Sequence, residues 1–385
     1  MLLIVESHPV QYHAPVYRYA AQVEGVPLTV VYGSDFSVQG YRDVEFGTSV
    51  RWDTDLLGGY AHFFLSCTQR KPGKDYGSVR AGGYASILRA LAPRAALVLG
   101  YSSSFDRAVL RQTLLHGVDL MFRGEVNDLA SRRGPLRALT RDLALRTLYK
   151  RCASVLPLGQ RAREHYRRLG VEDRRMFSSP YCVALSDTGE TRDVAALRAS
   201  LGLDANRYLL LFSGKLVSRK GIDLLPAGIA ALPIEWRSRL TLVFVGAGER
   251  ADALEEQLKA IKGLEAKFLG FRNQSELADI YAAVDALVLP SISGETWGLV
   301  VNEALSFGKP ALVSDRVGCA PDLVESGVTG EVFQSANAAD LALKLARLLS
   351  WCRDRAVAER CRARVADYSV AAAGRGIANA WRALA

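Results

Sequence analysis

Long apolar runs are absent from this sequence: none approaches the roughly 20 residues that a membrane-spanning helix needs. The first residues, Met1 to Glu6, carry no basic segment and end in a glutamate, so we interpret them as a buried strand and not as a signal peptide. Cysteine is scarce, and its six copies form no Cys-x-x-Cys pair. This argues against a zinc site or a disulfide framework and favours a reducing cytoplasm.

The length and net charge of the chain indicate how many domains it has and which partners suit it. A chain of 385 residues exceeds the roughly 250–300 residues that one hydrophobic core fills, which predicts two domains. Its 49% of hydrophobic residues argues against large-scale disorder. The formal net charge of +9 suits anionic partners such as nucleoside diphosphates or acidic lipid headgroups. Nucleic acid is not expected, because the chain has no helix-turn-helix pattern and no aromatic-rich RNA-binding motif.

Short β-branched runs alternate with helical patterns in both halves of the chain. In the first half we expect strands at 2–5, 28–32, 61–65, 95–99, 119–122 and 154–158, and helices at 79–91, 105–115 and 136–149. In the second half we expect strands at 208–212, 240–245, 266–269, 285–289 and 310–313, and helices at 222–232, 251–261, 274–283 and 297–307. Apolar strands separated by helices predict parallel sheets that are covered on both faces.

This alternation predicts an α/β fold with two doubly wound, Rossmann-like domains that face each other across a cleft. The first domain should span residues 1–185 and the second 208–368, with a linker at 186–207. We expect a C-terminal helix, 369–385, to pack back on the first domain. Ligands of doubly wound sheets bind at the carboxyl ends of the strands, so the cleft is the expected site.

The segment after Pro290 carries the strongest chemical signal. A loop of small residues leads into a helix that we expect to begin near Thr296, and the free amides of such a helix start bind phosphate well. Glu295 lies at this start and Glu303 eight residues later, a little over two turns, so both carboxylates should lie on nearly the same side of the helix. They could hold sugar and ribose hydroxyls; alternatively, Glu295 caps the helix and Glu303 is a solvated surface charge.

Two more glycine-containing loops follow strands of the second half. The first contains Gly214 and Lys215 and continues to Lys220, and two lysines five residues apart could converge on a pyrophosphate. An ordinary basic turn would give the same pattern. The second loop contains Gly246 and Gly248 and is weak evidence by itself.

These motifs closely resemble those of retaining glycosyltransferase family 4 (glycosyl transferases group 1), which has the GT-B fold. The resemblance is strong over residues 211–333 and much weaker in the first half. It rests on a glutamate pair separated by seven residues and on the residues around it: Pro290-Ser291, Glu295, Glu303-Ala304, Gly308-x-Pro310, Gly318 and Gly327-x-x-Gly330.

The resemblance implies where a sugar donor binds. Glu295 would contact the donor sugar and Glu303 the ribose, while Lys215 and Lys220 would neutralise the leaving diphosphate. Relatives carry arginine at the first cation, so bidentate geometry is lost at Lys215 and Lys220 is the safer assignment. The other donor-side candidates are Gly214, Gly246, the amides of Thr296, Trp297, Gly298 and Leu299, and, near the base, Phe271 and Arg272, the latter of which also fits a plain surface loop.

The first domain departs from the resembling family after its first strand. Relatives usually carry a glycine-rich loop there, whereas residues 7–13 of this chain contain no glycine. The loop instead offers polar side chains that should face the cleft on the acceptor side: His8, Gln11, Tyr12 and His13. His8 could equally brace the turn at Pro9.

A second departure concerns a histidine that many relatives carry at the end of a middle strand. Here the strand at 119–122 is followed by Arg123 and Glu125, and His116 lies at the opposite end of the strand. We therefore assign Arg123 and Glu125 to the acceptor side. The candidate catalytic residues are Glu295, Lys220, Lys215, His13 and Glu125.

The segment from Arg123 to Arg175 is strongly basic, with fourteen basic and six acidic residues. The helix expected at 136–149 has apolar and basic residues at helical spacing. One interpretation is a packed amphipathic helix with a solvated face. The other is a peripheral contact of residues 132–175 with an anionic membrane or a lipid-linked acceptor.

We predict that the protein transfers a sugar, with retention of configuration, from a UDP- or GDP-type sugar to a glycan, lipid-linked or small-molecule acceptor. The resemblance implies that no metal or other cofactor is needed, since the lysines and helix amides would supply the positive charge. Two alternatives stay open: a nucleotide-sugar epimerase or hydrolase on the same fold, and a non-catalytic nucleotide-sugar-binding protein. The expected location is the cytoplasm, with the inner face of the membrane as its variant.

Overall fold

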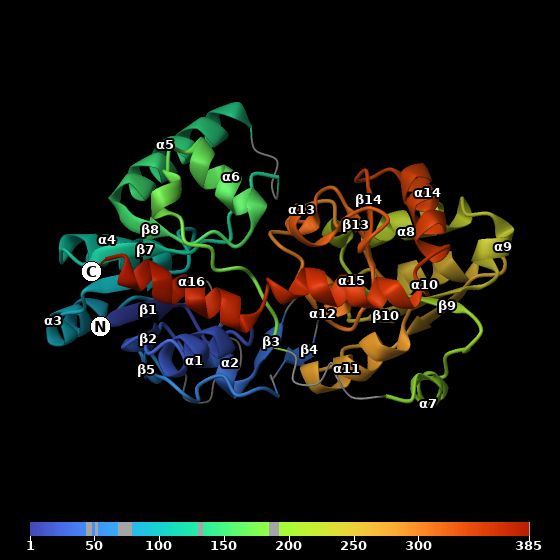
Figure 1. The fold of residues 1–385 in the computed structure, drawn as a ribbon, viewed down its shortest axis with the longest axis horizontal. Helices are drawn as coiled ribbons and strands as arrows, with labels where there is room; N and C mark the ends of the chain where they lie inside the picture. The colour runs from blue at the N-terminus through green and yellow to red at the C-terminus, as the bar shows by residue number, and fades with distance from the viewer. Residues whose placement is uncertain (44–47, 51–52, 68–78, 130–133, 185–191, 385) are drawn as a thin grey trace.

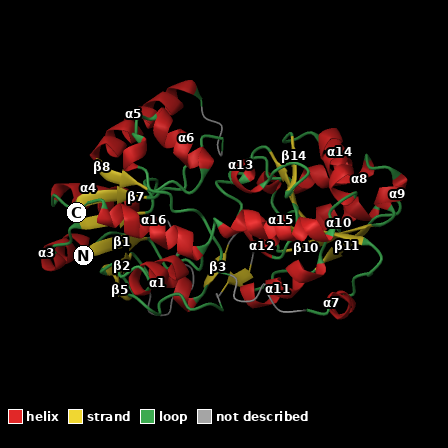
Figure 2. Cartoon of the chain, viewed as in Figure 1, coloured by secondary structure: helices red, strands yellow, loops and turns green. Residues whose placement is uncertain are grey.

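Two α/β domains lie side by side along the long axis of the molecule (Figure 1). The computed structural model describes residues 1–43, 48–50, 53–67, 79–129, 134–184 and 192–384. Each domain is built on a six-stranded sheet with helices around it (Figure 2). In these described segments, no helix is long and apolar enough to cross a bilayer.

The first sheet has the strand order β5-β2-β1-β6-β7-β8, with every pair parallel. Its strands are β1 (Leu2–Glu6), β2 (Leu28–Tyr32), β5 (Ala61–Phe64), β6 (Ala95–Val98), β7 (Asp119–Phe122) and β8 (Cys152–Val155). The helices of this half are α1 (Ala14–Gln22), α2 (Phe36–Gln39), α3 (Tyr84–Leu91), α4 (Ser104–Leu115), α5 (Pro135–Arg151) and α6 (Gln160–Arg168). A small antiparallel pair, β3 (Tyr41–Asp43) and β4 (Thr48–Val50), follows α2.

The second sheet repeats the same order as β11-β10-β9-β12-β13-β14, again with parallel pairs. Its strands are β9 (Tyr208–Ser213), β10 (Leu240–Val245), β11 (Glu265–Phe268), β12 (Ala286–Leu289), β13 (Ala311–Ser314) and β14 (Gly330–Phe333). Its helices are α7 (Val194–Ser200), α8 (Leu225–Ala230), α9 (Ile234–Arg237), α10 (Ala251–Lys259), α11 (Gln274–Ala283), α12 (Leu299–Ser306), α13 (Ala320–Leu323), α14 (Ala338–Leu349) and α15 (Arg355–Ala366). The prediction of two doubly wound domains is therefore confirmed.

The central strands are buried along their whole length. Every residue of β1, β2 and β10 is buried, because helices cover both faces of a parallel sheet. The expected strands agree with the structure within one residue at each end, except for 154–158. That strand is β8 and begins at Cys152, directly after α5, so the sequence-based placement was wrong by two to three residues.

The end of the chain joins the two domains. Helix α16 (Val370–Arg382) follows α15 of the second domain and packs against α1 of the first domain. Ala373, Ile377 and Ala380 are buried in one apolar cluster with Val16 and Ala20. Figure 1 shows α15 and α16 as a red band running across both domains.

The predicted linker at 186–207 includes helix α7. This helix packs against α11 of the second domain. Arg198 is buried, and its guanidinium donates to the Ala283 carbonyl and pairs with Asp285 at 2.9 Å. The residues from 193 onward are therefore attached to the second domain.

Candidate active site

The strand order reverses at one point in each sheet, between β1 and β6 and between β9 and β12. Loops that leave the carboxyl ends of strands on either side of such a point splay apart and leave a crevice for a ligand. The loops after β1 and β7 and those after β9, β10 and β12 carry nearly all the candidate residues. The two domains turn these crevices toward each other.

The loop after β12 differs from the prediction. Helix α12 begins at Leu299, three residues later than expected, and Gly298 precedes it with φ +104°. A β-carbon on Gly298 would lie 2.9 Å from Leu289 and 3.0 Å from Val317, so the chain turns tightly here before the helix starts. Glu295 therefore lies in the loop, and the expectation that Glu295 and Glu303 share one side of the helix was wrong.

Glu295 forms a close ion pair with Lys220. The Lys220 Nζ lies 2.5 Å from Glu295 Oε2, and Ser291 Oγ donates to the same oxygen at 2.9 Å. The side chains are 11% and 18% exposed, so the pair is largely screened from water. The loops after β9 and β12 are thereby joined at the cleft, with a cation and a carboxylate side by side.

Glu303 is fully buried, which rules out the alternative of a solvated surface charge. Its carboxylate accepts the Tyr281 hydroxyl at 2.6 Å and the Gln274 amide at 3.2 Å. The hydroxyl of Tyr12, from the first domain, also hydrogen-bonds to it. Burial raises the pKa of Glu303, and the three donors only partly offset that rise.

Backbone contacts hold the two glycine loops of the second domain together. The Gly214 N–H donates to Val245 and the Leu216 N–H to Ala247, both at 2.9 Å. Gly246 has φ +131°, and a β-carbon on it would lie 1.9 Å from the Gly214 carbonyl oxygen. Only glycine fits at this position, so the wall of the cleft here is backbone. Lys215 is half-buried beside it.

A cavity of about 120 Å³ opens between these glycine loops and the first domain. It is lined by Gln11 and Tyr12 on one side and by Gly214, Gly246, Phe271, Arg272, Gln274 and Glu303 on the other. Gln11 Oε1 is buried there, and within the described part of the chain it has no hydrogen-bond partner. A buried orphan acceptor is costly, which points to a ligand donor at this spot.

The guanidinium of Arg272 bonds to residues of its own loop and of the helix that follows. Its guanidinium donates to the Leu269 carbonyl at 3.1 Å and pairs with Glu276 at 2.8 Å. Glu276 completes a capping box with Asn273 at the start of α11. Arg272 lines the cavity, but its contacts are those of a structural residue at a helix start.

The first-domain loop forms a buried polar network in place of a glycine loop. His13 Nδ1 lies 2.6 Å from Glu6 Oε1, and the Tyr17 hydroxyl donates to Glu6 Oε2 at 3.0 Å. Arg123 Nη1 lies 3.3 Å from His13 Nε2. Guanidinium only donates, so Nε2 accepts and Nδ1 carries the proton that bonds Glu6. Glu6 and Tyr17 were missed from the sequence; the only signal was an acid ending a buried strand.

Glu125 and its neighbour Asn127 connect the domains at the loop after β7. Glu125 accepts the Tyr181 hydroxyl at 2.5 Å and the Thr296 hydroxyl at 3.0 Å. The amide of Asn127 reaches the backbone carbonyl of Glu295 at 3.5 Å. Residues assigned to the acceptor side therefore touch the loop assigned to the donor side.

Trp297 is a packing residue at the same junction. Its indole is buried, donates to Asn302 at 2.8 Å and lies 6.3 Å from the Tyr181 ring. Asn302 in turn donates to the Tyr181 carbonyl at 3.2 Å. The side chain of Trp297 thus positions the loop, and only its backbone amide is left for a ligand.

His8 packs into the turn and also lines a small polar cavity. Its Nδ1 lies 2.8 Å from Ser7 Oγ, and its ring lies 4.5 Å from that of Phe36. Burial lowers the pKa of His8. The cavity, about 160 Å³, also borders Glu6, His13, Glu125 and Tyr181. His8 therefore braces the turn and also faces the cleft.

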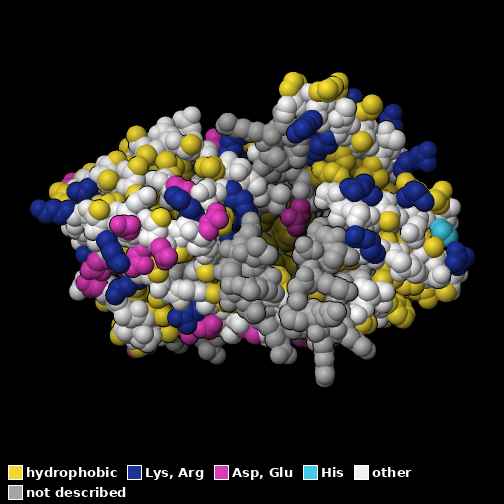
Figure 3. Space-filling model, turned by 180° about the vertical axis from the view of Figure 1, so that it is seen from behind, with side chains coloured by type: hydrophobic (Ala, Val, Ile, Leu, Met, Phe, Trp, Pro, Cys, Tyr) yellow, Lys and Arg dark blue, Asp and Glu magenta, His cyan; other side chains and the backbone are white. Residues whose placement is uncertain are grey.

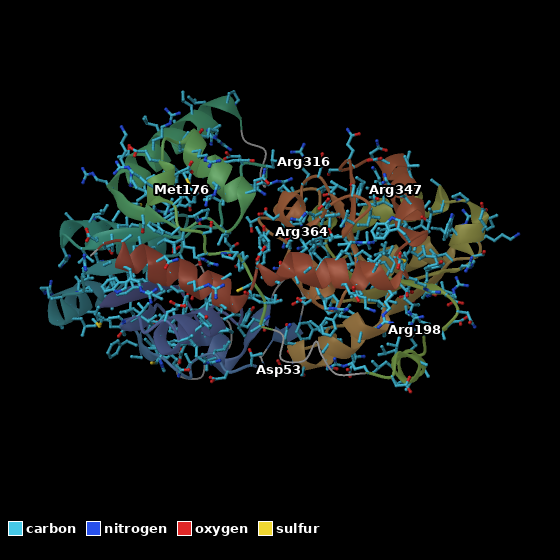
Figure 4. The ribbon with its side chains drawn as sticks, viewed as in Figure 1. Asp53, Met176, Arg198, Arg316, Arg347 and Arg364 are labelled. Atoms are coloured by element: carbon cyan, nitrogen blue, oxygen red, sulfur yellow. The ribbon has the colours of Figure 1, made fainter. Side chains whose placement is uncertain are left out.

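A larger cavity, about 690 Å³, lies between α6, α13 and α16, away from these carboxylates. Met176, labelled in Figure 4, lines it from the first domain. Asp322 at its edge accepts the Gln160 N–H at 2.9 Å and the Tyr368 hydroxyl at 3.0 Å. Gln160 is the first residue of α6, so a second-domain carboxylate caps a first-domain helix.

An Asp-x-Asp triplet occurs at Asp53-Thr54-Asp55, away from the cleft carboxylates in the sequence. Asp53 accepts the Ser275 N–H at the start of α11, at 3.1 Å, near the bottom of the view in Figure 4. Asp55 accepts two N–H groups of its own turn and pairs with Arg18 at 3.0 Å. Among the described residues, no group of three His, Cys, Asp or Glu side chains could hold a metal ion.

Known proteins resemble this chain mainly in its second domain. The family model of glycosyl transferases group 1 matches residues 193–363. An uncharacterized glycosyltransferase of Methanocaldococcus jannaschii is 35% identical over 156 residues, which are 40% of this chain and 38% of that relative. A D-inositol 3-phosphate glycosyltransferase of Frankia alni is 36% identical over 208 residues, 51% of this chain and 50% of that relative. The matches thus span half or less of these relatives' lengths.

A solved structure extends the likeness to the first domain. Anabaena HepE in complex with UDP and glucose aligns over 99% of both chains, with a TM-score of 0.71 and 18% identity. At this identity the likeness concerns the fold. Membership of family 4 in particular stays a prediction. Residues 193–363 thus match the model of glycosyl transferases group 1, and the chain as a whole has the GT-B fold.

Proposed function

We propose that this chain is a glycosyltransferase that moves a sugar from a nucleoside diphosphate sugar to an acceptor hydroxyl. The observation that carries the proposal is the ion pair of Lys220 and Glu295 at the cleft, in a domain that also buries the carboxylate of Glu303. Lys220 would bind the diphosphate, Glu295 the transferred sugar and Glu303 the ribose. The family match and the UDP complex of the structural neighbour support the same assignment.

The donor nucleoside would enter the cavity between the glycine loops and Tyr12. Ribose hydroxyls would donate to the Glu303 carboxylate and take over from Tyr12 or Gln274. The Gln11 acceptor, which has no partner in the described residues, lies on the same cavity wall and could receive a donor of the nucleotide. UDP and GDP stay equal candidates, because the Arg272 guanidinium is already bound by Leu269 and Glu276.

The diphosphate would lie against Lys215, Lys220 and the free amides of Thr296 to Leu299. When the phosphate takes the Lys220 ammonium, Glu295 is released to hold hydroxyls of the transferred sugar. Positive groups aimed at the leaving oxygen stabilise the charge that develops in the transition state. The same groups make a metal unnecessary in this proposal.

The reaction would retain the anomeric configuration. The bond from sugar C1 to the diphosphate oxygen breaks while the acceptor oxygen bonds C1 on the same face, and the departing phosphate oxygen takes the acceptor proton. No strong protein base is then required. His13 has both ring nitrogens occupied, by Glu6 and Arg123, so we assign it to positioning the acceptor side and Glu125 to holding the acceptor.

Two substitutions test the assignment of the carboxylates. Glu303→Ala should raise the Kd for UDP, because the ribose contact is the same in ground and transition states. Glu295→Ala should mainly lower kcat. Wild-type kinetics in both variants would overturn the site. Binding of each nucleoside diphosphate, seen as a rise in Tm, identifies the base.

Product analysis separates transfer from the two alternatives. Turnover of the donor without an acceptor would indicate a hydrolase or an epimerase, and nucleotide binding with no turnover under any condition would indicate a binding protein. The anomeric signal of the product in NMR tests retention directly. Activity should survive EDTA; activity lost in EDTA and restored by Mg²⁺ or Mn²⁺ would refute the metal-free mechanism.

The acceptor is proposed as a chemical class, and the location as a compartment. A glycan, a lipid-linked sugar and a small polyol all present hydroxyls that Glu125, His8 and Gln11 could bind. A cytoplasmic enzyme would share a compartment with the nucleotide-sugar pool, which fits the six cysteines, none in a disulfide in the described chain.

A further inference from the structure

We propose that the outward face of α5 binds the surface of an anionic lipid bilayer. Three leucines of this helix point into solvent: Leu136 is 73% exposed, and Leu139 and Leu143 are each 67% exposed. Their spacing of three and four residues places them on one side of the helix. Leu145 and Tyr149 are buried on the opposite side, so the helix is already anchored to its domain without the three leucines.

Basic side chains frame the leucines. At about 100° per residue, Arg146 lies at the edge of the leucine face, Lys150 lies on that face two turns beyond Leu143, and Arg137 lies about 100° around the helix from Leu136. All three are exposed, and within the described part of the chain none of them forms an ion pair. The one acid of α5, Asp142, is turned inward and accepts Arg168 at 3.1 Å. Apolar residues bordered by unpaired cations are typical of helices that lie in a headgroup region.

The polar groups on this face need no water. The hydroxyl of Thr140 donates to the Leu136 carbonyl at 3.1 Å, and that of Thr147 donates to the Leu143 carbonyl at 3.0 Å. Both threonines therefore already have a partner for their one donor when the face is desolvated. This removes the cost that unsatisfied hydroxyls would add on insertion.

Charge complementarity selects a bilayer over a second copy of the chain. A two-fold dimer through this face would bring Arg146 and Lys150 of both copies close together, which is repulsive. Acidic headgroups would neutralise them. Figure 3 shows yellow and dark-blue side chains together over the upper part of the first domain, where α5 lies in Figure 1. The proposal does not depend on the transferase activity, since an inactive protein would bind in the same way.

Vesicle flotation of the full chain tests this proposal. We expect binding to vesicles of phosphatidylcholine with phosphatidylglycerol, and little binding to phosphatidylcholine alone. Replacing Leu136, Leu139 and Leu143 by serine should lower the partition coefficient at least about tenfold, because three apolar side chains lose their insertion. Replacing Arg146 and Lys150 by glutamine should lower it about fivefold for each charge removed, and high salt should have a similar effect.

A matched control uses leucines of equal exposure elsewhere. Leu115→Ser with Leu343→Ser changes side chains that are 72% and 67% exposed and lie outside α5, and it should leave vesicle binding unchanged. A Tm equal to that of the wild type verifies that each variant is folded. Equal binding to neutral vesicles, or full binding by the α5 leucine variant, would overturn the proposal. So would a dimer in solution that this variant abolishes, because the face would then be a contact between copies.

Discussion

The loop after β1 and the loop after β9 occupy the same place in two sheets of identical strand order, yet they are built in opposite ways. After β9 the chain passes through Gly214, and a neighbouring glycine allows backbone to touch backbone. After β1 there is no glycine, and His13 is fixed through Glu6 and Arg123. One crevice wall presents backbone amides and lysine cations, whereas the other presents a network of hydrogen-bonded side chains. Topology therefore determines where a site lies, and the local residues determine its chemistry.

The largest effect should follow from removing the cation of the second-domain wall. Lys220→Ala should lower kcat about 10²–10³-fold, because the leaving diphosphate loses a charge-stabilising partner. Steady-state kinetics with a donor and an acceptor measure it. Lys259→Ala, on the exposed surface of α10, is the control and should keep the wild-type rate. Normal turnover of the Lys220 variant would contradict the assignment of charge stabilisation to the second-domain wall of the crevice.

The glycine wall should also be intolerant of a single methyl group. Gly246→Ala places a β-carbon 1.9 Å from the Gly214 carbonyl oxygen and requires φ near +131°. We expect the free energy of unfolding to fall by about 2–3 kcal/mol, together with a loss of UDP binding. Denaturant titration measures the first and calorimetry the second. Gly82→Ala, which meets no atom within 4 Å, should be neutral, and equal stability of the two variants would contradict the close-approach argument.

The side-chain wall should control the acceptor alone. His13→Ala and Glu125→Ala should each lower transfer about 10–100-fold through misplacement of the acceptor, with the Kd for UDP nearly unchanged. His116→Ala is a matched control, because that histidine is exposed at the far end of β7. If UDP affinity collapsed in the His13 variant, or acceptor kinetics stayed normal in both, the acceptor would have to bind elsewhere.

The smallest effect is a pH dependence of donor affinity. Burial raises the pKa of Glu303, so its carboxylate becomes protonated at a higher pH than the ordinary value of 4.5. Ribose hydroxyls need the charged form as acceptor, and UDP affinity should therefore fall about threefold to tenfold as the pH drops from neutrality through this raised pKa. Calorimetry at several pH values measures it. Glu303→Gln should flatten the profile, whereas Glu235→Gln, on the exposed surface of α9, should leave it unchanged.

The second domain could be predicted from the sequence further than the first. Uniformly buried strands such as β10 appear as unbroken apolar runs, and Glu295 and Glu303 stand in a recognisable frame. Strand β14 was missed because Glu331 interrupts its apolar pattern. That glutamate is buried beside Arg347 of α14, 3.1 Å away, and Lys344, 3.7 Å away, which are partners that sequence order does not indicate.

The first-domain network was hidden for the same reason. Glu6 and His13 belong to one segment, but Arg123 is 110 residues further on, and strand pairing alone brings them together. The start of α12 was misplaced because helical pattern extends to Thr296, whereas the turn at Gly298 depends on what surrounds it. The local sequence pattern therefore predicted where most helices and strands lie, whereas contacts between distant residues determine the geometry of the site.

The crossing of α16 has a consequence for biosynthesis. The buried face of α1 is covered by Ala373, Ile377 and Ala380, so the domain encoded first lacks part of its interior until residues 370–382 have been translated. An emerging chain would hold that apolar surface open while the whole second domain is made. Emergence of α16 from the ribosome then becomes the step that completes the first domain, and chaperone binding should be directed at the uncovered α1 until that moment.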